Sequence, residues 1–99
     1  MYIIHVTYEV KDGMRDAFLK KLKKLGTAEC SRAEEGNLDY TYYISPDRED
    51  IVFLTEVWES MDAQKAHTQT SHFKALGEIK GEYVQNTVLK FFDGAVQIN

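Results

Sequence analysis

The chain has 99 residues, a formal net charge of −4 and a hydrophobic content of 43%. This length predicts a single domain over residues 1–99, and the hydrophobic content excludes a disordered chain. The acidic balance argues against a nucleic-acid partner, because affinity for phosphates rests on clustered Lys and Arg, and no apolar run approaches the ~20 residues of a membrane span. With one cysteine, Cys30, no intrachain disulfide is possible, and we expect a cytoplasmic protein without a membrane partner.

The first third of the chain predicts a strand followed by a helix. Along Tyr2–Val10 the even positions are apolar and the odd positions are mixed, which is the two-residue period of a strand. Along Met14–Arg32 the apolar residues recur at helical spacing, and we expect one helix there, with Gly26 as the weak point in its middle. Cys30 on this helix is predicted to be a buried structural thiol.

The middle of the chain predicts an antiparallel hairpin. Two strand-like segments, Leu38–Ile44 and Ile51–Trp58, are separated by a short polar turn. The second segment is apolar on both faces, with Ile51, Phe53 and Val57 on one and Val52, Leu54 and Trp58 on the other. Helices can cover only one face of such a sheet, so we predict a homodimer in which a second copy covers the other face.

The last third of the chain predicts two helices and a strand. Ser60 is a suitable N-cap for a short helix that ends near His67, a further helix follows, and Tyr83–Phe92 has the composition of a final strand. The element order is therefore β-α-β-β-α-β, which is typical of the α+β ferredoxin-like fold. We expect an antiparallel four-stranded sheet with its helices on one face.

Two of the three histidines, His67 and His72, lie five positions apart in the sequence AHTQTSHF. On one continuous helix their side chains would point about 140° apart, at ~100° per residue. No cysteine cluster or acidic ladder completes a set of metal ligands, and no glycine-rich phosphate-binding loop is present. The sequence therefore predicts neither a metal site nor a cofactor, and it places His72 near the N-terminus of a helix.

A polar and aromatic set lies around the end of the third predicted strand. Trp58 ends that strand, Glu56 lies on the same face two residues earlier, and His67 follows on a helix that can fold back over the sheet. A carboxylate on an apolar face is uncommon unless it is paired or functional, and a histidine can serve as a general base near neutral pH. The alternative is structural, with Trp58 in the core, Glu56 paired with a Lys or Arg, and His67 capping its helix. On the functional hypothesis we expect His67 to be partly exposed at its helix end.

Three segments resemble the antibiotic biosynthesis monooxygenase domains of the dimeric α/β-barrel superfamily. They are EEGNLDY over Glu34–Tyr40, EVWES over Glu56–Ser60 and AHTQTSHF over Ala66–Phe73. Their order and spacing follow the family, and the similarity extends over nearly the whole chain. The resemblance implies a dimeric α/β barrel, in which a pocket lies between helices and sheet and the other sheet faces pack together in the dimer.

Family members similar to this chain include monooxygenases that act on quinols or anthrones with O₂ and use no flavin, haem or metal. Others degrade haem, and one is an isomerase of a small phosphorylated signalling sugar. The resemblance nominates three pocket residues as catalytic, and we add three neighbours as substrate contacts for a small aromatic or hydrophobic molecule. The candidate catalytic residues are Asn37, Trp58 and His67, and the candidate substrate contacts are Glu56, Tyr40 and His72.

The sequence departs from the haem-degrading branch of the family at two positions. Gly77 stands where that branch has a histidine, and Val6 aligns with its asparagine, so haem would lack an axial ligand. We therefore expect a cofactor-independent monooxygenase of a small aromatic, quinol-like substrate. Two alternatives stay open: an isomerase or lyase of a small polar metabolite, and a non-catalytic dimeric stress-response protein that binds a small ligand.

Overall fold

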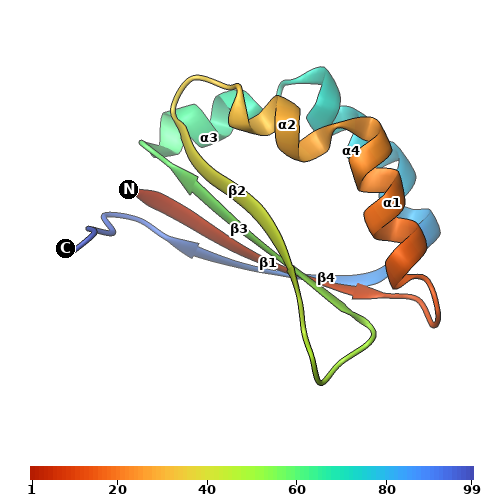
Figure 1. Cartoon of the computed structure of the whole chain (residues 1–99). Helices are drawn as coiled ribbons and strands as arrows, with labels where there is room; N and C mark the ends of the chain where they lie inside the picture. Colours follow the sequence, from red (N-terminus) through yellow and green to blue (C-terminus); the bar gives the residue numbers. More distant parts are fainter.

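The structure, a computed structural model, describes all 99 residues. Its elements are β1 (Tyr2–Val10), α1 (Arg15–Leu25), α2 (Thr27–Arg32), β2 (Asn37–Ile44), β3 (Ile51–Trp58), α3 (Met61–His67), α4 (Ser71–Tyr83) and β4 (Val84–Phe92). The strands form one antiparallel sheet in the order β2-β3-β1-β4, and the helices cover one face of it (Figure 1). The predicted α+β ferredoxin-like fold is confirmed. None of the helices has the length and apolar character needed to cross a membrane.

The helix expected over Met14–Arg32 is broken into α1 and α2 at Gly26. Gly26 has a left-handed φ of 69°, and its N–H donates to the carbonyl oxygens of Leu22 and Lys23, which closes α1 as a C-terminal cap. The prediction of one continuous helix is therefore wrong. Glycine has no Cβ to oppose this conformation, so the chain turns here at little cost.

Cys30 lies in α2 with its side chain exposed, so the prediction of a buried thiol is wrong. This short helix buries Thr27 and Ser31, which are four positions apart and therefore share one face. Cys30 is one position away from Ser31 and points to a different face of the helix.

The hydrophobic core lies between the helices and the inner face of the sheet. The even positions of β1 and β3 alternate with less buried neighbours, as predicted, and turn toward the helices. Phe18 and Leu22 of α1 and Leu76 of α4 complete the buried cluster. Within this buried row of the sheet, Glu56 is the one charged side chain, and it is only 7% exposed. The strand alternation thus holds a carboxyl group inside an apolar layer.

No helix covers the outer face of the sheet (Figure 1). This face carries an aromatic cluster. The ring of His5 on β1 lies 5.2 Å from the rings of both Phe53 on β3 and Phe92 on β4, and Tyr43 on β2 lies 6.4 Å from Phe53. We refer to these four residues, one from each strand, as the outer-face cluster. Tyr43 is 51% exposed and Phe92 is 45% exposed, which is unusual for large rings gathered in one patch.

Candidate active site

A cavity of about 310 Å³ lies between the inner face of the sheet and helices α3 and α4. Seven hydrophobic side chains from β1, α4 and β4 form most of its wall. A volume of this size is at the low end of small-molecule pockets, which run from about 300 Å³ upward. Its polar groups are Glu56, Gln64, Thr68, Lys80 and Thr87.

Glu56 is the one acidic side chain in the wall of this cavity. The indole Nε1 of Trp58 donates a hydrogen bond to its Oε1 at 3.1 Å. No Lys or Arg lies within ion-pair distance of the carboxyl group, so the structural alternative in which Glu56 pairs with a Lys or Arg is wrong. Burial raises the pKa of Glu56 from its ordinary 4.5 to about 7, against the opposing effect of the indole bond and with a further contribution from Glu34. Glu56 therefore exchanges its proton near neutral pH.

The fluorescence of Trp58, the only tryptophan in the chain, should report the ionisation of Glu56. Because the indole N–H bonds to this carboxyl group, we expect the emission of the wild-type protein to change with a midpoint near pH 7. An emission scan between roughly pH 4 and pH 9 measures it across the pKa range that proteins give to carboxyl groups. The matched control is Glu56→Gln, which should remove the transition. Persistence of the same transition in that variant would assign it to another group.

His67 ends α3, and its imidazole packs against four other rings. The centroid distances from its imidazole are 4.8 Å to Trp58, 5.2 Å to Phe73, 5.6 Å to His72 and 5.8 Å to Tyr40. With 2% exposure it is fully buried, so the expectation of a partly exposed helix-end histidine is wrong. Its Nδ1 bonds to Glu34, so the structural alternative in which His67 caps its helix is wrong too. Its Nε2 lies 3.9 Å from Oε1 of Glu56. His67 is thus behind the cavity wall, with Glu56 between it and the cavity.

The charge state of His67 follows from this burial. Burial lowers the pKa of His67, and the neighbouring Glu34 carboxylate only partly offsets that effect. The ring is therefore neutral at neutral pH. It presents one nitrogen to Glu56 and the other, Nδ1, to Oε2 of Glu34 at 2.5 Å.

Glu34, in the loop between α2 and β2, joins the two histidines and was absent from the predicted site. Its Oε2 lies 2.5 Å from Nδ1 of His67 and 2.8 Å from Nε2 of His72. The histidines lie on different helices, α3 and α4, so the expected divergence of about 140° on one helix does not apply. The three groups offer ligand atoms within 4.8 Å of one another, a spacing that suits a cation, but here one carboxylate oxygen satisfies both rings.

Gly36 explains why the loop can hold Glu34 against His67. Its φ is +86°, and a Cβ at this position would lie 2.7 Å from the Cβ of Ala63 on α3. The backbone N–H of Glu59 donates to the carbonyl of Gly36 at 2.8 Å. A residue without a side chain therefore lets the loop lie directly on α3, which brings the carboxylate two positions earlier to the buried histidine.

The two remaining candidates, Tyr40 and Asn37, both lie on β2 but differ in what their side chains contact. Tyr40 is 1% exposed and pairs with Glu56 across the sheet, and burial raises its pKa, so it stays a neutral phenol. Asn37 pairs with Trp58, but its amide donates to the backbone carbonyl of Asp39 at 3.1 Å. The structure thus gathers four of the other five candidates around His67. It leaves the Asn37 amide bonded to the backbone carbonyls of Asp39 and Val57.

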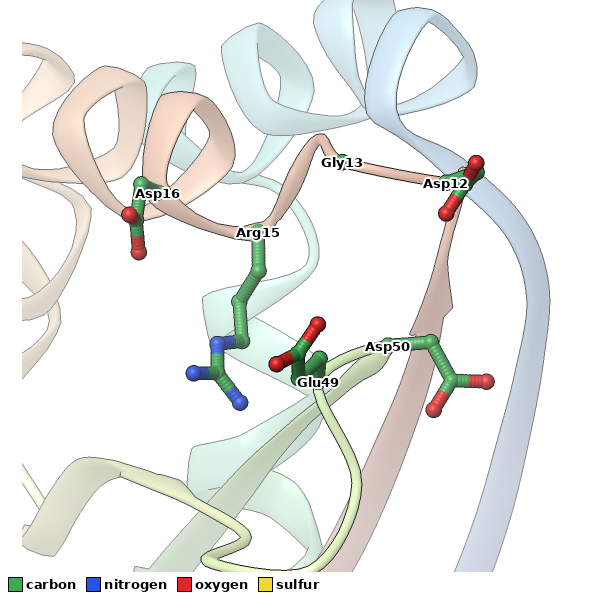
Figure 2. Close-up of a pocket in the computed structure, with 6 residues that line it drawn as sticks. All are labelled: Asp12, Gly13, Arg15, Asp16, Glu49 and Asp50. Carbon is green, nitrogen blue, oxygen red and sulfur yellow. The ribbon is translucent and has the colours of Figure 1, made fainter.

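A second hollow lies at the other end of the sheet (Figure 2). It is open and polar, and it is lined by Asp12, Gly13, Arg15, Asp16, Glu49 and Asp50. Arg15 donates to the carbonyl of Arg48 at 3.0 Å, which ties the start of α1 to the β2–β3 turn. Ile51 and Trp58 are the two ends of β3, with the hollow beside Ile51 and the His67 site beside Trp58. At ~3.3 Å per residue the two features are therefore roughly 20 Å apart. The hollow lies between the β1–α1 loop and the β2–β3 turn and shares no residue with the His67 site.

Comparison with known proteins places this site in a family. Residues 1–78 match the family model described as antibiotic biosynthesis monooxygenase. The chain belongs to the antibiotic biosynthesis monooxygenase family. YcnE, a candidate monooxygenase of Bacillus subtilis (strain 168), is 32% identical to it over 74 residues, which cover 75% of this chain and 76% of YcnE.

Solved structures agree with this antibiotic biosynthesis monooxygenase assignment. A candidate antibiotic biosynthesis monooxygenase from Caulobacter crescentus CB15 is 30% identical, with a TM-score of 0.84 over 97% of this chain and 90% of that chain. Rv0793 from Mycobacterium tuberculosis is 19% identical, with a TM-score of 0.86 over 99% of this chain and 98% of its own, and supports the fold alone.

The family match covers one part of the site and leaves another part outside it. Glu34, Glu56 and the two histidines all lie within residues 1–78 of this antibiotic biosynthesis monooxygenase domain. Lys80 and the β4 wall of the cavity lie beyond the matched residues. The acid–base groups therefore belong to the part of the chain that the family model describes. The cavity wall formed by Lys80 and β4 lies outside that part.

Proposed function

We propose that the protein is a monooxygenase that combines O₂ with a small aromatic quinol-like or anthrone-like substrate, and that Glu56 is its general base. The observation that carries this proposal is a carboxyl group with a pKa of about 7 in the wall of a largely apolar cavity. A base is most effective when its pKa lies near the working pH. Apolar walls suit an aromatic ring and keep water away from the reactive anion.

The substrate itself supplies the electrons in this reaction. Glu56 takes a proton from the hydroxyl group or acidic carbon of the substrate, and the resulting anion is electron-rich enough to react with O₂. For an anthrone, the CH₂ group becomes a carbonyl: one atom of O₂ enters the ring, and the other leaves as water with the two hydrogens. The protein therefore binds, deprotonates and shields the substrate, without a redox group of its own.

Lys80 supports an anionic intermediate in the same cavity. It lies in the wall formed by α4, is partly buried, and makes no ion pair with any carboxylate. A cation next to the forming phenolate or enolate stabilises the charge that develops as Glu56 accepts the proton. No local pattern in the sequence indicates which cation faces the pocket, because that depends on how α4 lies across the sheet.

Oxygen uptake tests the proposed function directly. With a panel of reduced naphthoquinones, benzoquinones and anthrones, we expect the protein to speed oxygen consumption above the spontaneous rate for at least one compound. With ¹⁸O₂, one labelled atom should appear in the product and one in water. If the protein accelerates none of these oxidations, the monooxygenase proposal is wrong, and an isomerase, a lyase or a ligand-binding protein becomes the better account.

We also propose that the protein is a homodimer that packs through the outer-face cluster. Light scattering at micromolar concentration should give twice the 11.4 kDa of one chain. Phe53→Asp should convert it to a monomer, because a buried unpaired charge at the centre of the cluster opposes association. The matched control is Met61→Asp, which replaces an exposed apolar residue on α3. A wild-type monomer, or a Phe53→Asp dimer, would contradict this assembly.

A further inference from the structure

Four titratable groups follow one another from the cavity wall toward the surface. Oε1 of Glu56 lies 3.9 Å from Nε2 of His67, whose Nδ1 lies 2.5 Å from Oε2 of Glu34. The same Oε2 lies 2.8 Å from Nε2 of His72. Side-chain exposure is 9% at Glu56, which faces the cavity, 2% at His67, and 14% and 15% at Glu34 and His72, so His67 is the most buried member and the last two are the ones nearer solvent.

We propose that His67, Glu34 and His72 form a proton path that connects Glu56 in the cavity with solvent. The inference rests on the proposed function, because it gives the proton that Glu56 takes from the substrate a route out of the apolar cavity. Within it, Glu34 both positions His67 and relays the proton, and His72 is the exchange point with water.

The hydrogen bonds fix which nitrogen of His67 faces Glu56. A carboxylate can only accept hydrogen bonds, so Nδ1 of His67 must carry the proton that bonds to Glu34. In the neutral ring, Nε2 is then a lone pair that faces Glu56. An approach of about 1 Å brings the 3.9 Å separation to hydrogen-bond distance. Glu34 thus holds His67 in the tautomer that can receive a proton from Glu56.

The proton steps balance along the path. The substrate gives its proton to the carboxylate of Glu56, and the acid so formed gives it to Nε2 of His67. The imidazolium passes its Nδ1 proton to Glu34. A turn of the half-buried His72 ring presents its unprotonated nitrogen to Glu34, and the ring then releases the proton to water. In each turnover the substrate loses one proton and solvent gains one. The two carboxylates return to their starting states, whereas each histidine is left with its proton on its other nitrogen and must exchange it back before the next turnover.

The groups that surround the path do not compete with it at neutral pH. Tyr8 of β1 and Tyr40 of β2 have pKa values raised by burial, and burial raises the pKa of Tyr42 of β2 to about 12, so these phenols keep their protons. Arg32 of α2 donates to the carbonyl of Tyr40 and is always charged. Lys80 of α4 lines the cavity and bonds to none of the three path residues.

A laser-induced pH jump tests the path without any substrate. The rate at which Trp58 fluorescence follows the jump measures how fast Glu56 gains or loses its proton. In His72→Ala we expect this rate to fall by about 10²-fold, the lower end of an acid–base contribution, and to recover in proportion to added imidazole. His72→Gln keeps a donor for Glu34 without a titratable ring and should be equally slow. Lys74→Ala, an exposed change on the same helix, is the matched control and should behave as wild type.

The tautomer and the pKa of His67 provide a second test, because a purely structural role of Glu34 would not require a particular tautomer or pKa. In ¹⁵N NMR spectra of the wild type, the proton should be on Nδ1, and Glu34→Gln should lower the pKa of His67 by removing the carboxylate that favours its charged form. An unchanged pH-jump rate in both His72 variants, or a wild-type His67 with its proton on Nε2, would overturn the path. Both measurements are independent of oxygen uptake, so a failed monooxygenase proposal and a failed proton path give different results.

Discussion

Glu56→Gln should lower kcat on a quinol or anthrone substrate by about 10²–10⁴-fold, the usual contribution of a general base. Glutamine has nearly the same shape and can still accept the indole bond of Trp58, but it cannot take a proton. Oxygen uptake with the best substrate of the panel measures the effect. The control is Glu56→Asp, which keeps a carboxylate and should retain more activity than the glutamine variant.

The same substitution should stabilise the fold above neutral pH. Glu56 ionises near pH 4.5 in the unfolded chain and near pH 7 in the folded protein, so the folded state binds more protons between these values. Wild-type stability from this group is therefore present below pH 4.5 and is lost as the pH rises through 7, by about 3 kcal/mol. Denaturant unfolding measures the free energy of unfolding of both proteins at pH 5 and at pH 8. The difference, glutamine variant minus wild type, should increase from pH 5 to pH 8 by an amount of this order.

His67 acts on stability in the opposite direction and must be separated from Glu56. Burial lowers the pKa of His67, so the imidazole binds a proton more readily in the unfolded chain than in the folded protein. Its contribution is present above the unfolded value and is lost as the pH falls below it. A glutamine variant that loses no turnover, or whose stability relative to wild type does not change between pH 5 and pH 8, would show that Glu56 is not the base described above.

Trp58→Ala should destabilise the protein by about 3–5 kcal/mol, the cost of removing a fully buried large aromatic ring. The indole is 0% exposed and packs on His67, so the change opens a cavity beside the site. Denaturant unfolding measures the loss. Trp58→Phe keeps most of this packing and is the matched control for stability.

Trp58→Phe also separates the chemical role of the indole from its packing. Phenylalanine has no donor for Glu56, so the pKa of the carboxyl group should rise above its wild-type value of about 7. The acid limb of the pH profile of kcat/KM should therefore move to higher pH. An unmoved limb in a folded Trp58→Phe protein would show that the indole bond does not set this ionisation.

The fold was predictable because its signals are local. The two-residue alternation of β1 and β3 and the caps of α3 and α4 lie in short stretches of sequence. Ser60 accepts from the N–H of Ala63, and Thr70 accepts from the N–H of Phe73. The break at Gly26 was less predictable, because a glycine within a helical pattern can either cap the helix or continue it.

The site was predictable only in part because some of its contacts are long-range. Glu56 and Trp58 were found together since two positions on a strand share one face. Glu34 is 33 positions from His67 in the chain, and only its place at the start of the EEGNLDY segment marked it. The burial of His67 and the inward position of Lys80 depend on how α3 and α4 cross the sheet, which no local pattern specifies.

The alternation along β3 makes this strand intolerant of changes in length. Thr55 belongs to the outer face and Glu56 to the inner face, so deleting a single residue between Ile51 and Glu56 would exchange the two sets of side chains. The exposed turn over residues 45–50 can absorb insertions that the strand itself cannot. Point substitutions keep the register: even positions face the helices, where Glu56 lines the pocket, and odd positions face the outer side of the sheet. Substitutions that alter the pocket and substitutions that alter the outer face can therefore accumulate independently among descendants of this chain, provided that the spacing within β3 is kept.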